Sequence, residues 1–184
     1  MSILSVDIGG TFIKYALMSR NGDILSRGKI ATPKEGRDEL VETIGRLFDE
    51  MPDVEGIAIC MPGIIDPENG YCVTGGALRY NDDFYFRHVL YERCPVRIVM
   101  ENDAKCAAMA EAGMGALKDV CDGLVLIFGT MIGGGIIHDH RLYRGNTFPP
   151  EKCLYHTSRQ AAVVTCKFQN DANLYGALQC YLSE

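Results

Sequence analysis

Two adjacent glycines near the amino terminus, Gly9 and Gly10, place the strongest constraint on how this 184-residue chain can fold. An aliphatic run at 3–8 precedes them, and a second apolar segment begins at Phe12. Runs of this kind favour buried strands. Because glycine has no Cβ, the pair allows a tight turn with positive φ between two strands. Residues 1–19 therefore predict a strand, a hairpin turn and a second, antiparallel strand.

Helix and strand signals alternate after this hairpin and predict an α/β fold. The turn signal Asn21-Gly22-Asp23 precedes a third antiparallel strand. Three antiparallel strands followed by alternating helices and strands indicate a mixed sheet with flanking helices. The expected strands are at 24–30, 54–60, 96–100, 123–128 and 135–138, the expected helices at 36–50, 84–91, 104–115 and 171–182, and a long irregular loop is expected at 62–81.

Charge and composition argue against several classes of partner. Hydrophobic residues make up 47% of the chain and the net charge is -6, so there is a core but no basic stripe for nucleic acids or anionic membranes. No apolar stretch has the length of a membrane span, and no basic region precedes the first strand as in a signal peptide. The eight cysteines are scattered without a CxxC pair. We therefore expect a cytoplasmic protein with reduced, mostly buried thiols and no zinc site.

The residues around the glycine pair suit phosphate chemistry. Asp7 precedes the turn, and Thr11, which has a hydroxyl, and Lys14, which has an ammonium, follow it. A carboxylate, a hydroxyl, an ammonium and open backbone N–H groups are what a magnesium–polyphosphate needs. An ordinary glycine hairpin with a charged rim explains the same residues, and the motif alone leaves both interpretations open.

A second glycine-rich segment lies between two later strands. Gly129-Thr130 is followed by Gly133-Gly134, in a pattern that differs from both the phosphate loop ending in Gly-Lys-Ser/Thr and the dinucleotide GxGxxG motif. Two strand–glycine–strand segments are consistent with a polyphosphate held between two lobes. Taken alone, this segment is better explained as a glycine-rich turn.

Asn102 and Asp103 stand where a predicted strand ends and a helix begins. Open α/β sheets bind ligands at the carboxyl ends of their strands, and a helix amino terminus stabilises an anion. Asp103 is thus placed to accept a hydroxyl proton while that hydroxyl attacks a γ-phosphate. The alternative is that both residues only cap the helix.

Five motifs, in this order, resemble the ROK family, named for repressors, open reading frames and kinases. They are DIGGTFIK (7–14), PGIID (62–66), ENDAKCAAMAE (101–111), FGTMIGGGII (128–137) and RLYRG (141–145). The resemblance covers residues 1–145 almost continuously. It resumes at 168–178, which looks like the last helix of the family.

The resemblance implies a two-lobed α/β fold with the mixed sheet of actin and ribonuclease H. It also implies transfer of the γ-phosphate of ATP to a hydroxyl of a hexose or N-acetylhexosamine, with ATP and Mg²⁺ as cofactors. Asp103 would be the catalytic base, Asn102 would bind sugar hydroxyls, and Asp7 would orient the magnesium. The residues that would line the phosphates are Gly9, Gly10, Thr11, Lys14, Gly129, Thr130, Gly133 and Gly134, and those against the sugar are Gly63, Gly75 and Gly76.

The chain also departs from the family pattern. ROK proteins run to about 300 residues, and the resemblance places the gap between Gly145 and about Thr165. The expected lobes are 1–117 and an incomplete 118–184, the latter including the last helix. The Gly-Glu-x-x-His sugar segment, the cysteine-rich zinc segment and the adenosine turn have no counterpart here, and Met131 replaces a usual glycine.

These departures leave three interpretations open. The first is a shortened sugar kinase with weak or no activity, which could form a homodimer. The second is a non-catalytic sugar-binding or regulatory remnant. The third is that the sequence omits residues of a longer protein.

Overall fold

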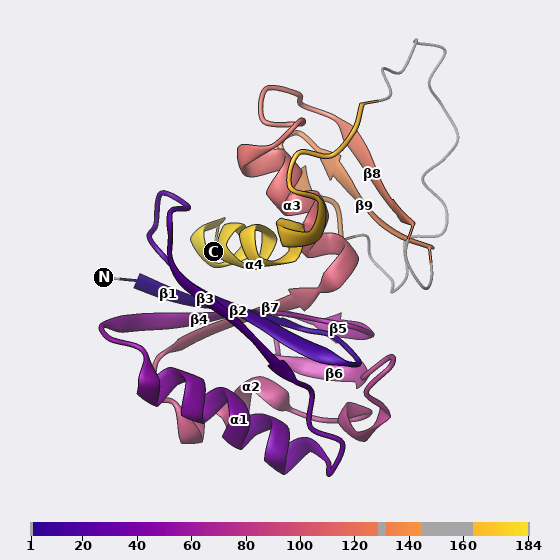
Figure 1. The fold of residues 1–184 in the computed structure, drawn as a ribbon. Coiled ribbons are helices and arrows are strands. Elements are labelled where there is room, and N and C mark those ends of the chain that lie inside the picture. Colours follow the sequence, from indigo (N-terminus) through magenta and orange to yellow (C-terminus); the bar gives the residue numbers. More distant parts are fainter. Residues whose placement is uncertain (1, 129–131, 145–163, 184) are drawn as a thin grey trace.

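A five-stranded mixed sheet forms the centre of the computed structural model, which describes residues 2–128, 132–144 and 164–183. Its strand order is β3-β2-β1-β4-β7 (Figure 1). β1 (Ser2–Ile8), β2 (Phe12–Met18) and β3 (Ile24–Ala31) form the predicted antiparallel meander. β4 (Val54–Met61) runs parallel to β1, and β7 (Arg97–Asn102) runs parallel to β4. The predicted mixed sheet is confirmed.

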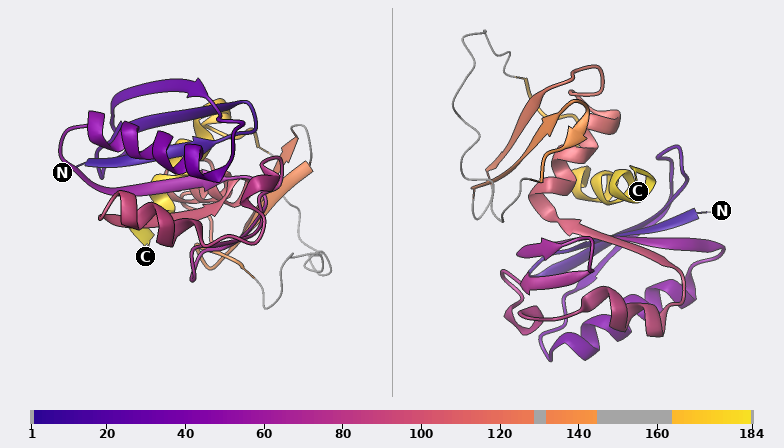
Figure 2. Two further views of the ribbon diagram at one scale, coloured as in Figure 1. Left: turned by 90° about the horizontal axis from the view of Figure 1, so that it is seen from below. Right: turned by 180° about the vertical axis from the view of Figure 1, so that it is seen from behind.

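Helices cover both faces of this sheet, as Figures 1 and 2 show. α1 (Arg37–Glu50) and α2 (Phe86–Arg93) pack on one face, and α4 (Ala172–Ser183) packs on the other. α3 (Asp103–Met114) follows β7 directly and lies against α4. Sequence reasoning grouped the last helix with the second lobe, but α4 packs on the first sheet and on α3. The division at residue 117 stays a prediction.

The alternation of side chains along β1 explains why a buried strand contains polar residues. Leu4, Val6 and Ile8 point into the core beneath α1 and α2. The residues between them face α4, where the hydroxyl of Ser5 donates to the carbonyl oxygen of Leu174 at 2.6 Å. This alternation brings Asp7, at the carboxyl end of the strand, to the α4 side of the sheet.

The segment at 62–81 was predicted as an irregular loop, and this was wrong. It contains a hairpin of β5 (Ile64–Asp66) and β6 (Tyr71–Thr74), followed by the 3₁₀ turn η1 (Arg79–Asn81). The carboxylate of Asp66 accepts the backbone N–H groups of Glu68 and Asn69 and so closes the turn. Strands this short carry too few residues for their alternation to stand out in the sequence.

A second, three-stranded sheet packs on α3. β8 (Gly123–Phe128), β9 (Ile132–His138) and β10 (Arg141–Leu142) are antiparallel in the order β10-β9-β8. β9 begins earlier than predicted, so Gly133 and Gly134 lie inside a strand rather than in a turn. A Cβ at Gly133 would stand 2.8 Å from the Cβ of Ala104 on α3. Close approach of strand and helix therefore explains this glycine.

Several predicted features lie outside the described residues. They are Gly129 and Thr130 of the second glycine segment, Met131, Cys153 and most of the proposed gap. Among the described cysteines, five are buried, which confirms the expectation of mostly buried thiols. Of the helices described, none has the length and apolar character needed to cross a membrane.

Candidate functional site

Three predicted site residues meet where parallel strands end. Asp7 of β1 pairs in register with Cys60 of β4, and Cys60 pairs with Glu101 of β7. Asn102 completes β7, and Asp103 opens α3. Because the strands are parallel, their carboxyl ends lie at one edge of the sheet. This edge is the candidate site.

Asp7 is held by two side chains from different parts of the chain. Asn173 of α4 donates from Nδ2 to Asp7 Oδ1 at 3.0 Å, and Lys14 Nζ lies 3.8 Å from Asp7 Oδ2. Lys14 also donates to the carbonyl oxygen of Asn170 at 3.0 Å. Burial raises the pKa of Asp7, while Asn173 and Lys14 oppose that rise. Sequence reasoning gave Asn173 no role, although it lies within the family-like segment 168–178.

The glycine pair after Asp7 does not adopt the predicted conformation. Neither Gly9 nor Gly10 has a positive φ. The pair allows close contacts instead. A Cβ on Gly9 would lie 3.0 Å from the carbonyl oxygen of Phe12, and one on Gly10 would lie 3.2 Å from the Cβ of Ala77. The second contact sets the hairpin against the turn that contains Gly75 and Gly76.

Asn102 caps α3 and also fastens the neighbouring loop. Its Oδ1 accepts the backbone N–H groups of Ala104 and Lys105 at 3.0 and 3.3 Å, and its Nδ2 donates to the carbonyl oxygen of Gly63 at 2.8 Å. The expected capping of α3 by Asn102 is therefore confirmed. Its predicted contact with sugar stays a prediction.

Asp103 opens α3 at the sheet edge where Asp7 lies. Burial raises the pKa of Asp103, and the negative charge of Asp7 raises it further. Asp103 Oδ1 accepts the N–H of Ala104 at 2.8 Å, which lowers that pKa in part. Perturbed carboxyl groups that share a site are typical of catalytic centres.

The three glycines expected beside a sugar come together in the structure. Gly63 has φ +105° and Gly76 has φ +60°, conformations that favour glycine. A Cβ on Gly63 would lie 2.0 Å from the carbonyl oxygen of Thr74, and one on Gly75 would lie 2.1 Å from that of Leu78. Close backbone packing thus requires glycine at both positions. Asn102 connects this loop to Asp103.

Glu101 is a buried carboxylate that sequence reasoning left without a role. It is completely buried, and Arg144 Nε lies 3.1 Å from its Oε2. Lys105 Nζ lies 3.8 Å from Oε1, which also accepts the N–H of Asn102 at 2.9 Å. Glu101 therefore ties the strand that bears Asn102 to the segment after β10. No spacing rule in the sequence pairs Glu101 with Arg144.

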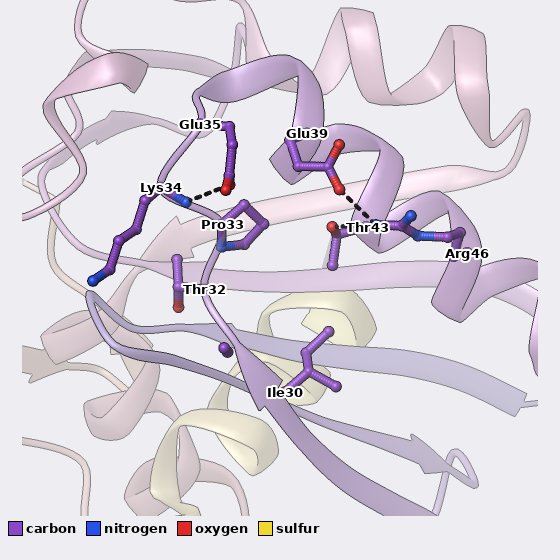
Figure 3. Close-up of a pocket in the computed structure, with 9 residues that line it drawn as sticks. Ile30, Thr32, Pro33, Lys34, Glu35, Glu39, Thr43 and Arg46 are labelled. Carbon is purple, nitrogen blue, oxygen red and sulfur yellow. Dashed lines mark hydrogen bonds and ion pairs between the residues drawn. The ribbon is translucent and has the colours of Figure 1, made fainter.

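A hollow of about 630 Å³ lies beside β3 and α1, apart from these carboxylates (Figure 3). Its wall includes Arg46, which donates to Glu39 at 2.7 Å and to Thr43 at 3.0 Å. No predicted site residue lines it. Thr32 connects it to the glycine hairpin, because its hydroxyl donates to the carbonyl oxygen of Gly9 at 2.6 Å. We therefore place the candidate site at the sheet edge rather than in this hollow.

Comparison with known proteins settles the family. Residues 3–167 match the model of the ROK family. This chain belongs to the ROK family. Asp7, Asn102 and Asp103, which belong to motifs that carried the resemblance, lie at the sheet edge.

ROK relatives include sugar kinases. A beta-glucoside kinase from Klebsiella pneumoniae is 36% identical over 148 residues, which cover 80% of this chain and 50% of the relative. A ROK family protein from Streptococcus pneumoniae TIGR4 in complex with sucrose has 33% identity and a TM-score of 0.71, over 79% of this chain and 49% of that one. A ROK family glucokinase from Streptomyces griseus in complex with glucose and AMPPNP has 31% identity and a TM-score of 0.71, over 79% and 47%.

These likenesses confirm the predicted actin-like α/β fold class of this ROK chain. The chain spans about half the length of the curated relatives it matches.

One buried amide in this ROK chain predicts a stabilising substitution. Asn81 of η1 is completely buried, and its side chain makes no hydrogen bond within the described residues. A buried amide without a partner costs about 1–3 kcal/mol. Asn81→Leu, which has a similar volume, should therefore raise the free energy of unfolding by about 1–2 kcal/mol in urea titrations.

Asn81→Asp serves as the matched control, because it keeps the shape and adds a charge that burial penalises. It should lower the stability. A leucine variant that unfolds at lower urea than the wild type would show that the amide has a stabilising partner.

Proposed function

We propose that this chain carries the phosphate- and sugar-binding edge of an ATP-dependent sugar kinase. The reaction is transfer of the γ-phosphate of ATP to a hydroxyl of a hexose or N-acetylhexosamine. The observation that carries the proposal is that Asp7, Asn102 and Asp103 lie where neighbouring parallel strands end, with Asn102 bound to the carbonyl oxygen of Gly63. The names of the ROK relatives, which are beta-glucoside kinases, N-acetyl-D-glucosamine kinases and a glucokinase, support the same reaction class.

In the proposed mechanism Asp103 is the general base. Its carboxylate accepts the proton of the sugar hydroxyl while the hydroxyl oxygen bonds to the γ-phosphorus, and the bond from that phosphorus to the bridging oxygen of ADP breaks. Phosphoryl transfer needs mainly positioning and charge neutralisation. The backbone at Gly9, Gly10 and Thr11 would position the phosphates, and the Lys14 ammonium would neutralise part of their charge.

The residues at this edge fit a magnesium ion held mainly by phosphate and water. Mg²⁺ in nucleotide sites takes one or two protein carboxylates and keeps several waters. Asp7 is a buried carboxylate near a second one, and a cation would relieve the repulsion that raises the pKa of Asp103. When bound, Mg²⁺ would offset the charge that develops on the phosphates. Asp7 would hold it.

A coupled ADP-release assay across a panel of hexoses, N-acetylhexosamines and β-glucosides tests the proposal. We expect sugar-dependent ADP release that is slower than in the full-length relatives, because the chain spans about half their length. Calorimetric titration of the same sugars measures binding separately. Sugar binding without any ADP release would favour the non-catalytic sugar-binding alternative. Neither binding nor release with any sugar of the panel would contradict both.

A further inference from the structure

The segment at the start of α4 contacts each of the first three strands of the main sheet. Its contacts, strand by strand, are Asn173 with Asp7 and Leu174 with Ser5 in β1, Asn170 with Lys14 in β2, and Asp171 with Arg27 in β3. Two of these contacts reach Asp7 and Lys14 of the candidate site. The contacts with Ser5 and Arg27 already fasten the segment to the sheet, so the two at the site are available for another role.

Asn173 holds one oxygen of the Asp7 carboxylate. Asp7 is 8% exposed, and its Oδ1 accepts Asn173 Nδ2 at 3.0 Å. Its Oδ2 lies 3.8 Å from Lys14 Nζ, which is beyond the length of an ordinary hydrogen bond. The amide therefore fixes the carboxylate through Oδ1. Because the amide is uncharged, it leaves the negative charge of Asp7 able to attract a cation.

Asn170 holds the ammonium of Lys14 beside the same carboxylate. Its carbonyl oxygen accepts one N–H of Lys14 Nζ at 3.0 Å, and an ammonium has three donors. The Lys14 side chain is 38% exposed, and Lys14 pairs in register with Asp7. One segment of the chain thus holds both charged groups that the proposed function assigns to the metal-bound phosphates.

We propose that Asn173 is a positioning residue for the magnesium of ATP, an inference that rests on the proposed sugar kinase function. Asn173 acts through Asp7, because its hydrogen bond holds the carboxylate in one orientation instead of leaving it free to rotate. Carboxylates that bind metals are usually held by such hydrogen bonds, and loss of the hydrogen-bonding partner typically costs about 10–100-fold in metal affinity. Asn173 therefore sets how tightly the chain holds ATP with its metal.

Calorimetric titration of the full chain with ATP, in excess Mg²⁺ and separately in EDTA, tests this role. Asn173→Leu has a similar volume but no donor. It should weaken binding of Mg-ATP by about 10-fold or more. Binding of metal-free ATP should not change, because Asp7 contributes to ATP binding only through the metal. Asn173→Gln, which keeps the amide on a longer side chain, should recover part of the affinity for Mg-ATP.

Ser5→Ala is the matched control for a purely structural effect. The hydroxyl of Ser5 donates to the carbonyl oxygen of Leu174 at 2.6 Å, so this variant removes the other contact between β1 and the start of α4 and keeps the bond from Asn173 to Asp7. It should lower the melting temperature without changing the affinity for either form of ATP. Circular dichroism of each variant verifies the fold.

The possible results separate the role of Asn173 from the proposed function. A wild type that binds neither form of ATP would contradict both. A wild type that binds Mg-ATP, with an Asn173→Leu variant of equal affinity, would overturn the role of Asn173 alone. Equal weakening of both forms of ATP in Asn173→Leu would also overturn it, since Asn173 would then support the fold rather than the metal.

Discussion

Replacing Asp103 with asparagine should lower sugar-dependent ADP release by about 10²–10⁴-fold, the usual contribution of a positioned general base. Asparagine retains an oxygen for the Ala104 N–H, which Asp103 Oδ1 accepts at 2.8 Å, so the start of α3 should be preserved. It cannot accept the proton of the sugar hydroxyl. We therefore expect the loss in kcat, with little change in KM, when the coupled assay is run over a range of sugar concentrations.

The same substitution should leave the chain as stable as before or more stable. The pKa of Asp103 is raised above 3.8 by burial and by the charge of Asp7. The fold therefore favours the protonated carboxyl, and the cost of ionisation grows as the pH rises above 3.8 and is complete above the raised pKa. Asparagine avoids this cost. Asp103→Asn should melt at or above the wild-type temperature near about pH 7, and the difference should vanish in acid.

The pH dependence of the wild type follows from the same shift. Catalysis requires ionised Asp103, so the rate should fall as the pH drops through its raised pKa, at a pH above 3.8. Asp38→Asn, an exposed carboxylate in the first turn of α1, is the control and should leave rate and profile unchanged. Turnover that survives Asp103→Asn would contradict the assignment of the base.

The main sheet could be predicted from the sequence because its signals are local. Aliphatic runs mark β1 and β4, and the Asn21-Gly22-Asp23 turn marks the start of β3. Parallel strands put Asp7 and Asn102 at one edge, which required only their places at strand ends. The hairpin at 64–74 was missed because its strands have only three and four residues.

The contacts that complete the site could not be predicted, because they join distant parts of the chain. Asn173 and Asp7 are 166 residues apart, and Arg144 and Glu101 are 43 apart. Sequence spacing carries no signal for such pairs. The positive φ predicted for Gly9 and Gly10 was wrong. For Gly10 the reason is related, since a Cβ there would approach the Cβ of Ala77 in another segment, whereas a Cβ on Gly9 would approach the carbonyl oxygen of Phe12 within the same hairpin.

A single methyl group at Gly176 should destabilise the fold more than any other change considered. A Cβ there would lie 1.8 Å from the backbone carbonyl oxygen of Cys106, in the contact between α4 and α3. This is more than about 1.5 Å short of ordinary contact, and backbone atoms cannot rotate away as a side chain can. Gly176→Ala should therefore cost about 3 kcal/mol or more and lower the melting temperature by roughly 6–12 °C.

The loss of helix packing should also affect the candidate site, because Asn173 of α4 donates a hydrogen bond to Asp7 at 3.0 Å. Gly113→Ala is the matched control in the same helix pair, since a Cβ at Gly113 meets only the flexible end of Gln179. In this variant the gain in helix propensity, up to about 1 kcal/mol, should offset the cost of displacing the Gln179 side chain. Thermal melts followed by circular dichroism compare the two. If Gly176→Ala melts at the same temperature as Gly113→Ala and the wild type, α3 and α4 do not pack as closely as described. The support of Asp7 by α4 would then be wrong as well.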